Sequence, residues 1–236
     1  MYIIAPLSNC ASPEKRDRFL EYISKIAPVT LANEPKCHAY AWFRSAEDSD
    51  TVPHHWLRGF EVYEDIEANT VAHRASSEYK AFRAAVGEEG LLARPSDLRY
   101  WRPSGVGFLS REGDAGDSTT VNFMERNNRL PVAEARQYIV VDELTPQAGK
   151  KEAVLQQLAG LAEEAEEEPR VLNFWVLHRG IGEEDEGLLV FSRYKDRNAG
   201  TTFMEGTVEA WKTTSTFLEG ERRTTWVESG IGFLNR

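Results

Sequence analysis

The chain contains nearly the same octapeptide twice. Residues 104–111 read SGVGFLSR and residues 229–236 read SGIGFLNR. Earlier residues match in the same order: Tyr2 with Tyr138, Glu34 with Glu168, Phe60 with Phe191, Tyr63 with Tyr194 and Trp101 with Trp226. The spacing within these pairs falls from 136 residues at Tyr2 to 125 at Trp101, as loops of different length would cause. Self-similarity at this scale predicts an internal duplication, with residues 1–111 as repeat 1, 112–135 as a linker and 136–236 as repeat 2.

In repeat 1 the residue pattern predicts the element order βαββαβ. Ser12, Pro13 and Glu14 have the pattern of a helix start, namely a capping hydroxyl, a proline in the first turn and an acid at the positive end of the dipole. We expect this helix to end at Pro28 and then Pro35. The predicted strands are residues 2–7, 38–44, 56–63 and 98–109, and a second helical stretch covers 66–86 with a break near Ala75.

Repeat 2 shows the same order. Its predicted strands are residues 138–144, 171–177, 188–194 and 224–234, and its second helical stretch is 199–218. Apolar residues define the face of its first helix: Val154, Leu155, Leu158, Leu161 and Ala162. Within the polar linker, Val121, Phe123 and Met124 form an apolar cluster, which we expect to be held on the surface.

A βαββαβ unit forms a four-stranded antiparallel sheet with both helices on one face. The strand at 171–177 is apolar on both faces. The strand at 37–44 also has apolar residues on each face, so neither of its faces is purely hydrophilic. The face without helices therefore needs a cover, and the sheet of the other repeat is the simplest one. The predicted fold class is α+β, with two ferredoxin-like βαββαβ repeats whose sheets pack as an intramolecular α+β barrel.

Composition narrows the possible partners. The net charge is −10, which disfavours binding to nucleic acid or to an anionic membrane surface. No apolar run is long enough to span a membrane, and residues 1–6 do not resemble a signal peptide. Cys10 and Cys37 are expected to be buried, reduced thiols. We therefore expect a soluble cytoplasmic protein.

One stretch of repeat 1 resembles a known family. Residues 56–65, WLRGFEVYED, lead into Ala68, His73 and residues 76–82, SSEYKAF. This stretch is similar to the antibiotic biosynthesis monooxygenase (ABM) family of the dimeric α+β barrel superfamily, and the resemblance extends over most of the chain as two tandem copies. It implies a pocket between each sheet and its helices that holds a flat aromatic or polyketide-like substrate. Several family members oxygenate anthrones or hydroquinones with O₂ and without metal or flavin, others degrade haem, and others have no known activity.

The resemblance makes His73 the first candidate catalytic residue, because it matches the helix histidine of the family. Histidine can accept a proton near neutral pH, but a packed helix histidine is the alternative role. Met204 occupies the matching position of repeat 2, so we expect repeat 2 to be structural or degenerate. Trp42 and Arg44 are further catalytic candidates, because an indole N–H or a guanidinium can stabilise an oxyanion; core packing and solvent contact are the alternatives.

The candidate substrate-binding residues are Tyr40, Asn9, Tyr63, Tyr79 and Trp56. Asn9 also fits a turn, and Tyr63, which has a matching tyrosine in repeat 2, also fits core packing. The histidines and cysteines show no spacing typical of metal sites, and the adjacent His54 and His55 would point to opposite faces of a strand. We therefore expect no catalytic metal and no cofactor. The glycines of the two octapeptides are interpreted as allowing a bend or a close approach to the other sheet.

The leading hypothesis is a cofactor-independent monooxygenase that uses O₂ on an aromatic or polyketide molecule of secondary metabolism. One alternative is a redox-neutral cyclase or isomerase in the same pocket, and another is a non-catalytic binding or stress module. The duplication predicts a monomer with an internal pseudo-dimer, and a further homodimer remains compatible with it.

Overall fold

The computed structural model describes residues 1–111, 122–127, 136–180 and 186–234. The elements of the first half are β1 (Tyr2–Ile4), β2 (Leu7–Ser8), α1 (Pro13–Asn33), β3 (Cys37–Ser45), β4 (Leu57–Tyr63), a π-helix (Ala68–His73), α2 (Ser77–Glu88) and β5 (Tyr100–Phe108). Those that follow are α4 (Phe123–Asn127), β6 (Tyr138–Pro146), α5 (Lys151–Glu167), β7 (Val171–Arg179), β8 (Leu188–Tyr194), α6 (Arg197–Gly206), α7 (Val208–Ser215) and β9 (Leu218–Leu234).

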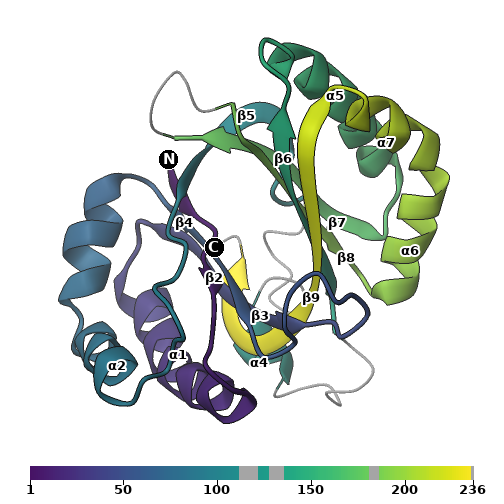
Figure 1. Ribbon diagram of the computed structural model, residues 1–236. Helices are drawn as coiled ribbons and strands as arrows, with labels where there is room; N and C mark the ends of the chain where they lie inside the picture. The colour runs from purple at the N-terminus through teal and green to yellow at the C-terminus, as the bar shows by residue number, and fades with distance from the viewer. Residues whose placement is uncertain (112–121, 128–135, 181–185, 235–236) are drawn as a thin grey trace.

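The strands form one closed antiparallel ring, which confirms the predicted α+β barrel. The hydrogen-bonded order is β1-β5-β7-β8-β6-β9-β3-β4, and β4 pairs again with β1 to close the ring. The predicted first strand is broken at Ala5 and Pro6 into β1 and β2, which both pair with β4. Helices α1 and α2 cover one side of the ring, and α5, α6 and α7 cover the other (Figure 1).

Matching strands occupy matching places in this ring. The last strand of the first half, β5, pairs with β7, and the last strand of the second half, β9, pairs with β3. The Ser104 hydroxyl donates to the Val176 carbonyl at 2.8 Å, and the Ser229 hydroxyl donates to the Trp42 carbonyl at 2.6 Å. The two octapeptides are thus the segments that join one half of the barrel to the other.

The second glycine of each octapeptide is required for this contact. Gly107 and Gly232 have φ values of +79° and +107°, and a Cβ at either position would lie 2.0 Å from a backbone oxygen of the opposite half, that of Phe174 or Tyr40. No side chain fits at that distance. The interpretation of these glycines as close-approach positions is therefore confirmed.

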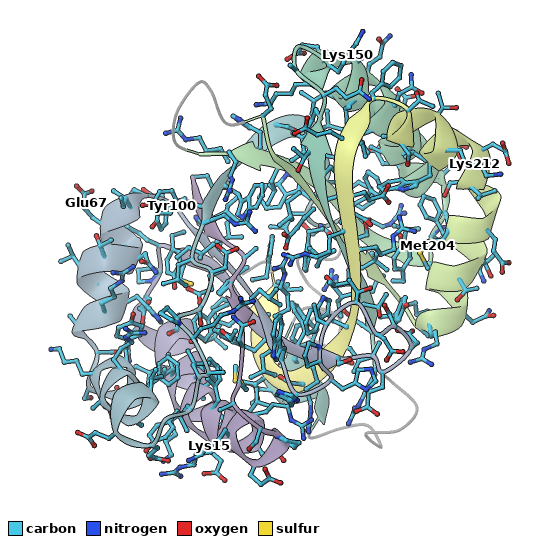
Figure 2. The ribbon with its side chains drawn as sticks, in the orientation of Figure 1. Lys15, Glu67, Tyr100, Lys150, Met204 and Lys212 are labelled. Carbon is cyan, nitrogen blue, oxygen red and sulfur yellow. The ribbon has the colours of Figure 1, made fainter. Side chains whose placement is uncertain are left out.

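Side chains alternate between the barrel interior and the helix-covered faces. On β3, Ala39, Ala41 and Phe43 belong to a central cluster with residues of both halves, whereas Tyr40 and Trp42 pack with α1 and α2. At the centre, the rings of Phe60 and Phe191 stack with their centroids 3.9 Å apart. The space inside the ribbon ring is accordingly filled by side chains (Figure 2).

The first helix is longer than its prolines suggest. Ser12 caps α1 as predicted, and its hydroxyl accepts from the Lys15 amide at 3.3 Å. However, α1 continues through Pro28 to Asn33, which corrects the prediction that Pro28 ends it. Because Pro28 has no N–H, the Ser24 carbonyl lacks its usual helical hydrogen-bond partner. Both residues are exposed, so water can bind that carbonyl. The opposite face remains packed on the sheet through residues such as Ile26 and Thr30.

The apolar cluster predicted in the linker is partly internal. Phe123, at the start of α4, is fully buried in the barrel interior, and its ring contacts Phe43 with 6.1 Å between centroids. Met124 packs against the cluster beneath α1 and α2, whereas Val121 lies outside the described residues. The expected surface position is therefore wrong for Phe123, because its ring fills space inside the barrel.

Two smaller features complete the fold. Cys10 and Cys37 are both buried and free, and burial raises the pKa of the Cys10 thiol to about 12. Among the described residues, no helix combines the length and the apolar character needed to cross a membrane.

Candidate active site

A cavity of about 400 Å³ lies between the first half of the sheet and its helices. This volume is within the range of small-molecule sites. Its walls come from β1, α1, β3, β4, the π-helix, α2 and the segment that precedes β5. The lining includes aromatic rings and two ionisable side chains, namely Trp42, Tyr40, Glu61, His73, Tyr79 and Phe82.

His73 is held at the cavity wall by a buried carboxylate. Its Nδ1 lies 3.0 Å from Oε2 and 3.2 Å from Oε1 of Glu34, and the Thr30 hydroxyl donates to Oε1 of the same carboxylate at 3.0 Å. The His73 side chain is 1% exposed. A carboxylate at Nδ1 fixes the tautomer with its proton there, so that Nε2 is the basic nitrogen.

The backbone around His73 is irregular only in the first half of the chain. Residues Ala68–His73 form a π-helix, whereas the matching stretch of the second half lies in the α-helix α6. Isolated π-helical turns occur frequently at functional sites because they redirect a side chain. Here the turn brings His73 among three tyrosine rings, with centroid distances of 5.2 Å to Tyr40, 5.8 Å to Tyr63 and 5.1 Å to Tyr79.

A second carboxyl group, that of Glu61, lines the cavity. The Tyr63 hydroxyl donates to its Oε2 at 2.8 Å. Burial raises the pKa of Glu61, although the neighbouring His73 and the Tyr63 hydrogen bond oppose this shift. Burial and the Glu61 carboxylate together raise the pKa of Tyr40 well above its usual value, so this phenol is neutral at physiological pH.

The Trp42 indole supplies an unused hydrogen-bond donor. Trp42 is 4% exposed, and its Nε1 has no hydrogen-bond partner in the described part of the chain. The nearby indole opposes the rise in the pKa of Tyr40, but its N–H does not form a hydrogen bond with the phenol. A buried donor without a partner is costly, so it is a natural contact for a ligand oxygen. Gly59 leaves room for the ring, since a Cβ there would lie 3.1 Å from it.

The structure brings together four of the residues singled out from sequence: His73, Trp42, Tyr40 and Tyr79 all line the cavity. Arg44 does not belong to it. Its guanidinium points to Asp17, 3.0 Å away, at the outer end of β3.

The remaining three predicted binding residues lie behind the cavity wall. Tyr63 is fully buried and positions Glu61. The Asn9 side chain accepts a hydrogen bond from Arg94 at 3.3 Å. The same guanidinium lies over the ring of Trp56, with its Cζ atom 5.3 Å from the ring centroid. These residues support the wall but do not line the cavity.

Sequence reasoning missed Glu34 and Glu61. Glu34 appeared only as one half of a matched pair, and the predicted end of α1 at Pro28 removed it from the helix. Glu61 lies within the strand of the stretch WLRGFEVYED, whose residues are buried. An acidic residue inside such a strand could have indicated a functional position.

The second half of the chain offers an internal comparison. Its equivalent cavity measures about 70 Å³ and is filled by Phe203, Trp211, Asp142 and Arg223. Nε of Arg223 lies 2.6 Å from Oδ1 of Asp142. At the positions of Tyr40, Glu61 and His73 it carries Phe174, Ser192 and Met204. Met204 lies on α6 (Figure 2). The tyrosine, glutamate and histidine at these three positions are thus found only in the half that has the open cavity.

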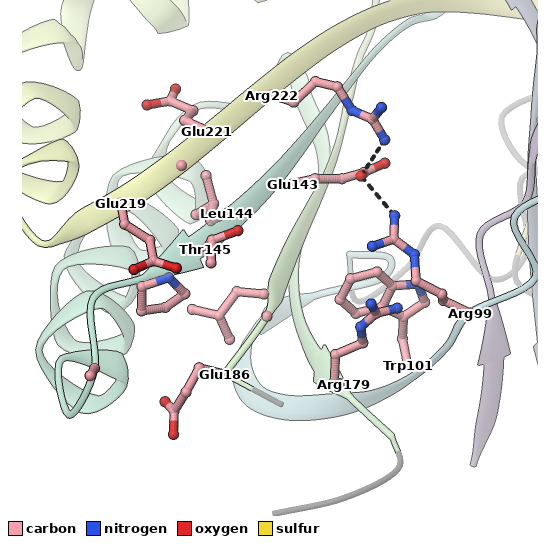
Figure 3. A pocket seen from close by; sticks show the side chains of 15 residues that line it. Arg99, Trp101, Glu143, Leu144, Thr145, Arg179, Glu186, Glu219, Glu221 and Arg222 are labelled. Carbon is pink, nitrogen blue, oxygen red and sulfur yellow. Dashed lines mark hydrogen bonds and ion pairs between the residues drawn. The ribbon is translucent and has the colours of Figure 1, made fainter. Parts of the chain in front are cut away.

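A larger open basin, of about 800 Å³, lies at one end of the barrel. Glu143 is its central group, bound by Arg99 at 3.0 Å and Arg222 at 2.5 Å (Figure 3). Arg58, which does not line the basin, also binds Glu143, at 2.7 Å. Burial alone would raise the pKa of Glu143, but the arginines overcome it and lower this pKa to about 2. Glu143, from the second half, is shared by Arg58 and Arg99 of the first half and by Arg222, so this basin has the character of a structural ion-pair network between the two halves.

Within the described ranges, no three His, Cys, Asp or Glu side chains are grouped so that they could hold a metal ion.

The fold and the cavity define an α+β barrel protein with a candidate small-molecule site between the first half of the sheet and its helices. Residues 1–85 match the family model described as "Antibiotic biosynthesis monooxygenase" (ABM). The matched segment contains His73, Glu34, Glu61 and Trp42. No curated protein is recognisably similar to the chain in sequence.

Solved structures share the fold of the whole chain. A "putative monooxygenase" from Lactobacillus acidophilus superposes with a TM-score of 0.69 at 10% identity and covers 100% of this chain and 99% of its own. A second protein so described, from Fusobacterium nucleatum, gives a TM-score of 0.71 at 10% identity, with 100% and 98% covered. An "anthrone oxidase-like protein" gives 0.62 at 15% identity, with 96% and 90% covered. At these identities the likeness establishes the fold alone.

Proposed function

We propose that the chain is a cofactor-independent monooxygenase that oxidises an electron-rich aromatic molecule, such as an anthrone or hydroquinone of polyketide metabolism, in the cavity of its ABM domain. The observation that carries this proposal is the His73–Glu34 pair at the wall of a cavity whose lining includes the rings of Phe19, Tyr40, Trp42, Tyr79 and Phe82. The ABM match and the name of the anthrone oxidase-like neighbour support the type of reaction.

The first step is removal of a proton from the substrate. Nε2 of His73 accepts a proton from a phenol or from an acidified C–H group, and the carboxylate of Glu34 stabilises the imidazolium that forms. The Trp42 N–H donates a hydrogen bond to the resulting oxyanion. The apolar walls exclude water, which strengthens both interactions.

The second step is oxidation of the substrate anion by O₂. The anion gives up electrons to O₂, and a bond forms between the carbon and one oxygen atom. For a methylene group the sum is R₂CH₂ + O₂ → R₂C=O + H₂O, so that one oxygen atom enters the product and the other leaves as water. The protons that enter the water come from the substrate, and the first of them is carried by His73.

The test is oxygen consumption by metal-stripped protein supplied with an anthrone. We expect turnover by the unmodified chain, and His73→Ala should reduce it by about 10²-fold or more, as for loss of a general base. Turnover that is unchanged without O₂ would instead select the redox-neutral cyclase or isomerase. Absence of any reaction with oxidisable aromatics would overturn the oxygenase proposal.

We further propose that one chain is the working unit. All eight positions of the ring are filled from a single chain, so closure of the barrel requires no second copy. A monomeric mass in sedimentation equilibrium at working concentration is the expected result, and activity only in a dimeric fraction would contradict it.

A further inference from the structure

Three arginines line the cavity at its solvent end. Arg74, Arg83 and Arg94 are exposed, in contrast to the buried His73 and Trp42 deeper inside. Arg74 extends from the residue after the π-helix, Arg83 from α2 and Arg94 from the segment before β5. They therefore approach the opening from three different elements.

None of these arginines forms an ion pair with a carboxylate of the described residues. Arg74 donates to the Asn69 amide oxygen at 3.0 Å, and Arg94 donates to that of Asn9 at 3.3 Å, so both partners are neutral. Several other surface arginines are paired with carboxylates: Arg18 with Glu21 and Glu89, Arg99 with Asp97, and Arg197 with Asp48.

The charge at the opening therefore contrasts with the rest of the molecule. The chain has a net charge of −10, yet the cavity is lined by three arginines and a single carboxyl group, that of Glu61. Glu61 lies deep in the cavity, where burial disfavours its ionised form. A positive rim around a cavity lined by several aromatic rings suits a ligand that is apolar at one end and anionic at the other.

The closed site of the second half differs in this respect as well. The two residues that match His73 and Arg74 are Met204 and Glu205, so the positive charge is replaced by a negative one. The arginine is thus found only beside the open cavity.

We propose that the cavity selects aromatic molecules that carry a carboxylate, which Arg74, Arg83 and Arg94 bind at the opening while the ring system lies against Trp42, Tyr79 and Phe82. This inference names the substrate class of the proposed function and rests on it for the reaction, but not for the binding. The arginines are specificity-determining residues. They set which molecule enters and on which side its ring faces His73.

The experiment compares two fluorescent probes of equal shape, anthracene-2-carboxylate and the neutral anthracene-2-carboxamide, in equilibrium titrations of the full chain. The carboxylate should bind about tenfold more tightly, as for one charge-assisted contact. Raising the salt concentration should reduce this preference. Arg83→Gln and Arg74→Gln should each weaken carboxylate binding several-fold and leave carboxamide binding unchanged.

Arg102→Gln is the matched control. It removes the same charge from an exposed arginine of β5 that does not line the cavity, and should leave both affinities unchanged. Equal binding of the two probes, or an equal loss in all three variants, would overturn the inference, as would failure of the carboxylate to bind. Equal binding leaves the oxygenase proposal intact, whereas a carboxylate preference without oxygen consumption would overturn the oxygenase proposal alone.

Discussion

Nδ1 of His73 lies 3.0 Å from Oε2 of Glu34, and both side chains are buried beneath the cavity of the first half. The two residues are separated by 39 positions in the chain. The end of α1 and a π-helical turn bring them together, and the π-helical turn lacks a counterpart in the second half, where the matching residues lie in the α-helix α6. The pair gives His73 a fixed orientation, which packing alone does not require.

Replacement of this carboxylate should affect the rate more than substrate binding. Glu34→Gln retains the shape of the side chain but removes the charge that stabilises the imidazolium, so kcat should fall by about 10²-fold while KM changes little. Steady-state oxygen uptake measures both quantities. Glu168→Gln is the matched control, because Glu168 is the equivalent residue of the second half and lies beside Arg170 at the surface. Equal effects of the two substitutions would contradict a role of Glu34 through His73.

A histidine placed in the second half should not restore activity. In the double variant His73→Ala/Met204→His, the new imidazole would face a cavity of about 70 Å³ that is filled by Trp211 and the Asp142–Arg223 pair. Substrate cannot reach it, so oxygen uptake should remain at the level of His73→Ala. Recovery of a substantial part of the original rate would show that the second half has an accessible site.

The octapeptide glycines should differ in their tolerance of alanine. Gly105 and Gly107 both have positive φ, so alanine at either position costs about 1–2 kcal/mol of backbone strain. A Cβ at Gly105 meets open space, whereas one at Gly107 meets the Phe174 carbonyl oxygen. Gly107→Ala should therefore lower the free energy of unfolding by ~1–3 kcal/mol more than Gly105→Ala. Urea denaturation measures this difference, and equal losses would contradict the close contact between the halves.

Acid should weaken the ion-pair network at the end of the barrel. The folded pKa of Glu143, about 2, is below its ordinary value of 4.5. The stabilisation is therefore complete above about pH 4.5 and is lost as the pH falls toward 2. Glu143→Gln should be destabilising by about 3 kcal/mol at pH 7, because it leaves the buried Arg58 without its counter-ion, and this difference should narrow below pH 4.5.

The control for this titration is Glu219→Gln, an exposed side chain that lines the same basin. Its effect on the free energy of unfolding should be small at every pH. A destabilisation by Glu143→Gln that stays constant from pH 7 to pH 2.5 would show that the carboxylate charge is not the stabilising element.

Much of the fold could be predicted from the sequence because residues of the two halves match in the same order, so each element could be compared with a second stretch of the chain. The strand Leu188–Tyr194 has exactly the predicted bounds, and the break near Ala75 lies between the π-helix and α2. Barrel closure followed from strands that are apolar on both faces. The end of α1 was wrong because a proline was treated as a stop, whereas the buried face held the helix together beyond it.

The candidate site was only partly predictable, for the same physical reason. His73 and Trp42 stood out by residue type, but their partners did not. Contact between Glu34 and His73 depends on one additional helical turn, and the cavity position of Glu61 depends on strand register. Arg44 was misplaced because alternation along β3 assigns a face but not the direction in which a side chain at the strand end extends.

The most direct test of the account is a single-turnover reaction of metal-stripped protein with an anthrone under ¹⁸O₂, with the product analysed by mass spectrometry. We expect one ¹⁸O atom in the product for each O₂ consumed, with formation slowed by about 10²-fold in His73→Ala and unchanged in Glu168→Gln. A product that contains no ¹⁸O, or that forms at the same rate without O₂, would contradict it.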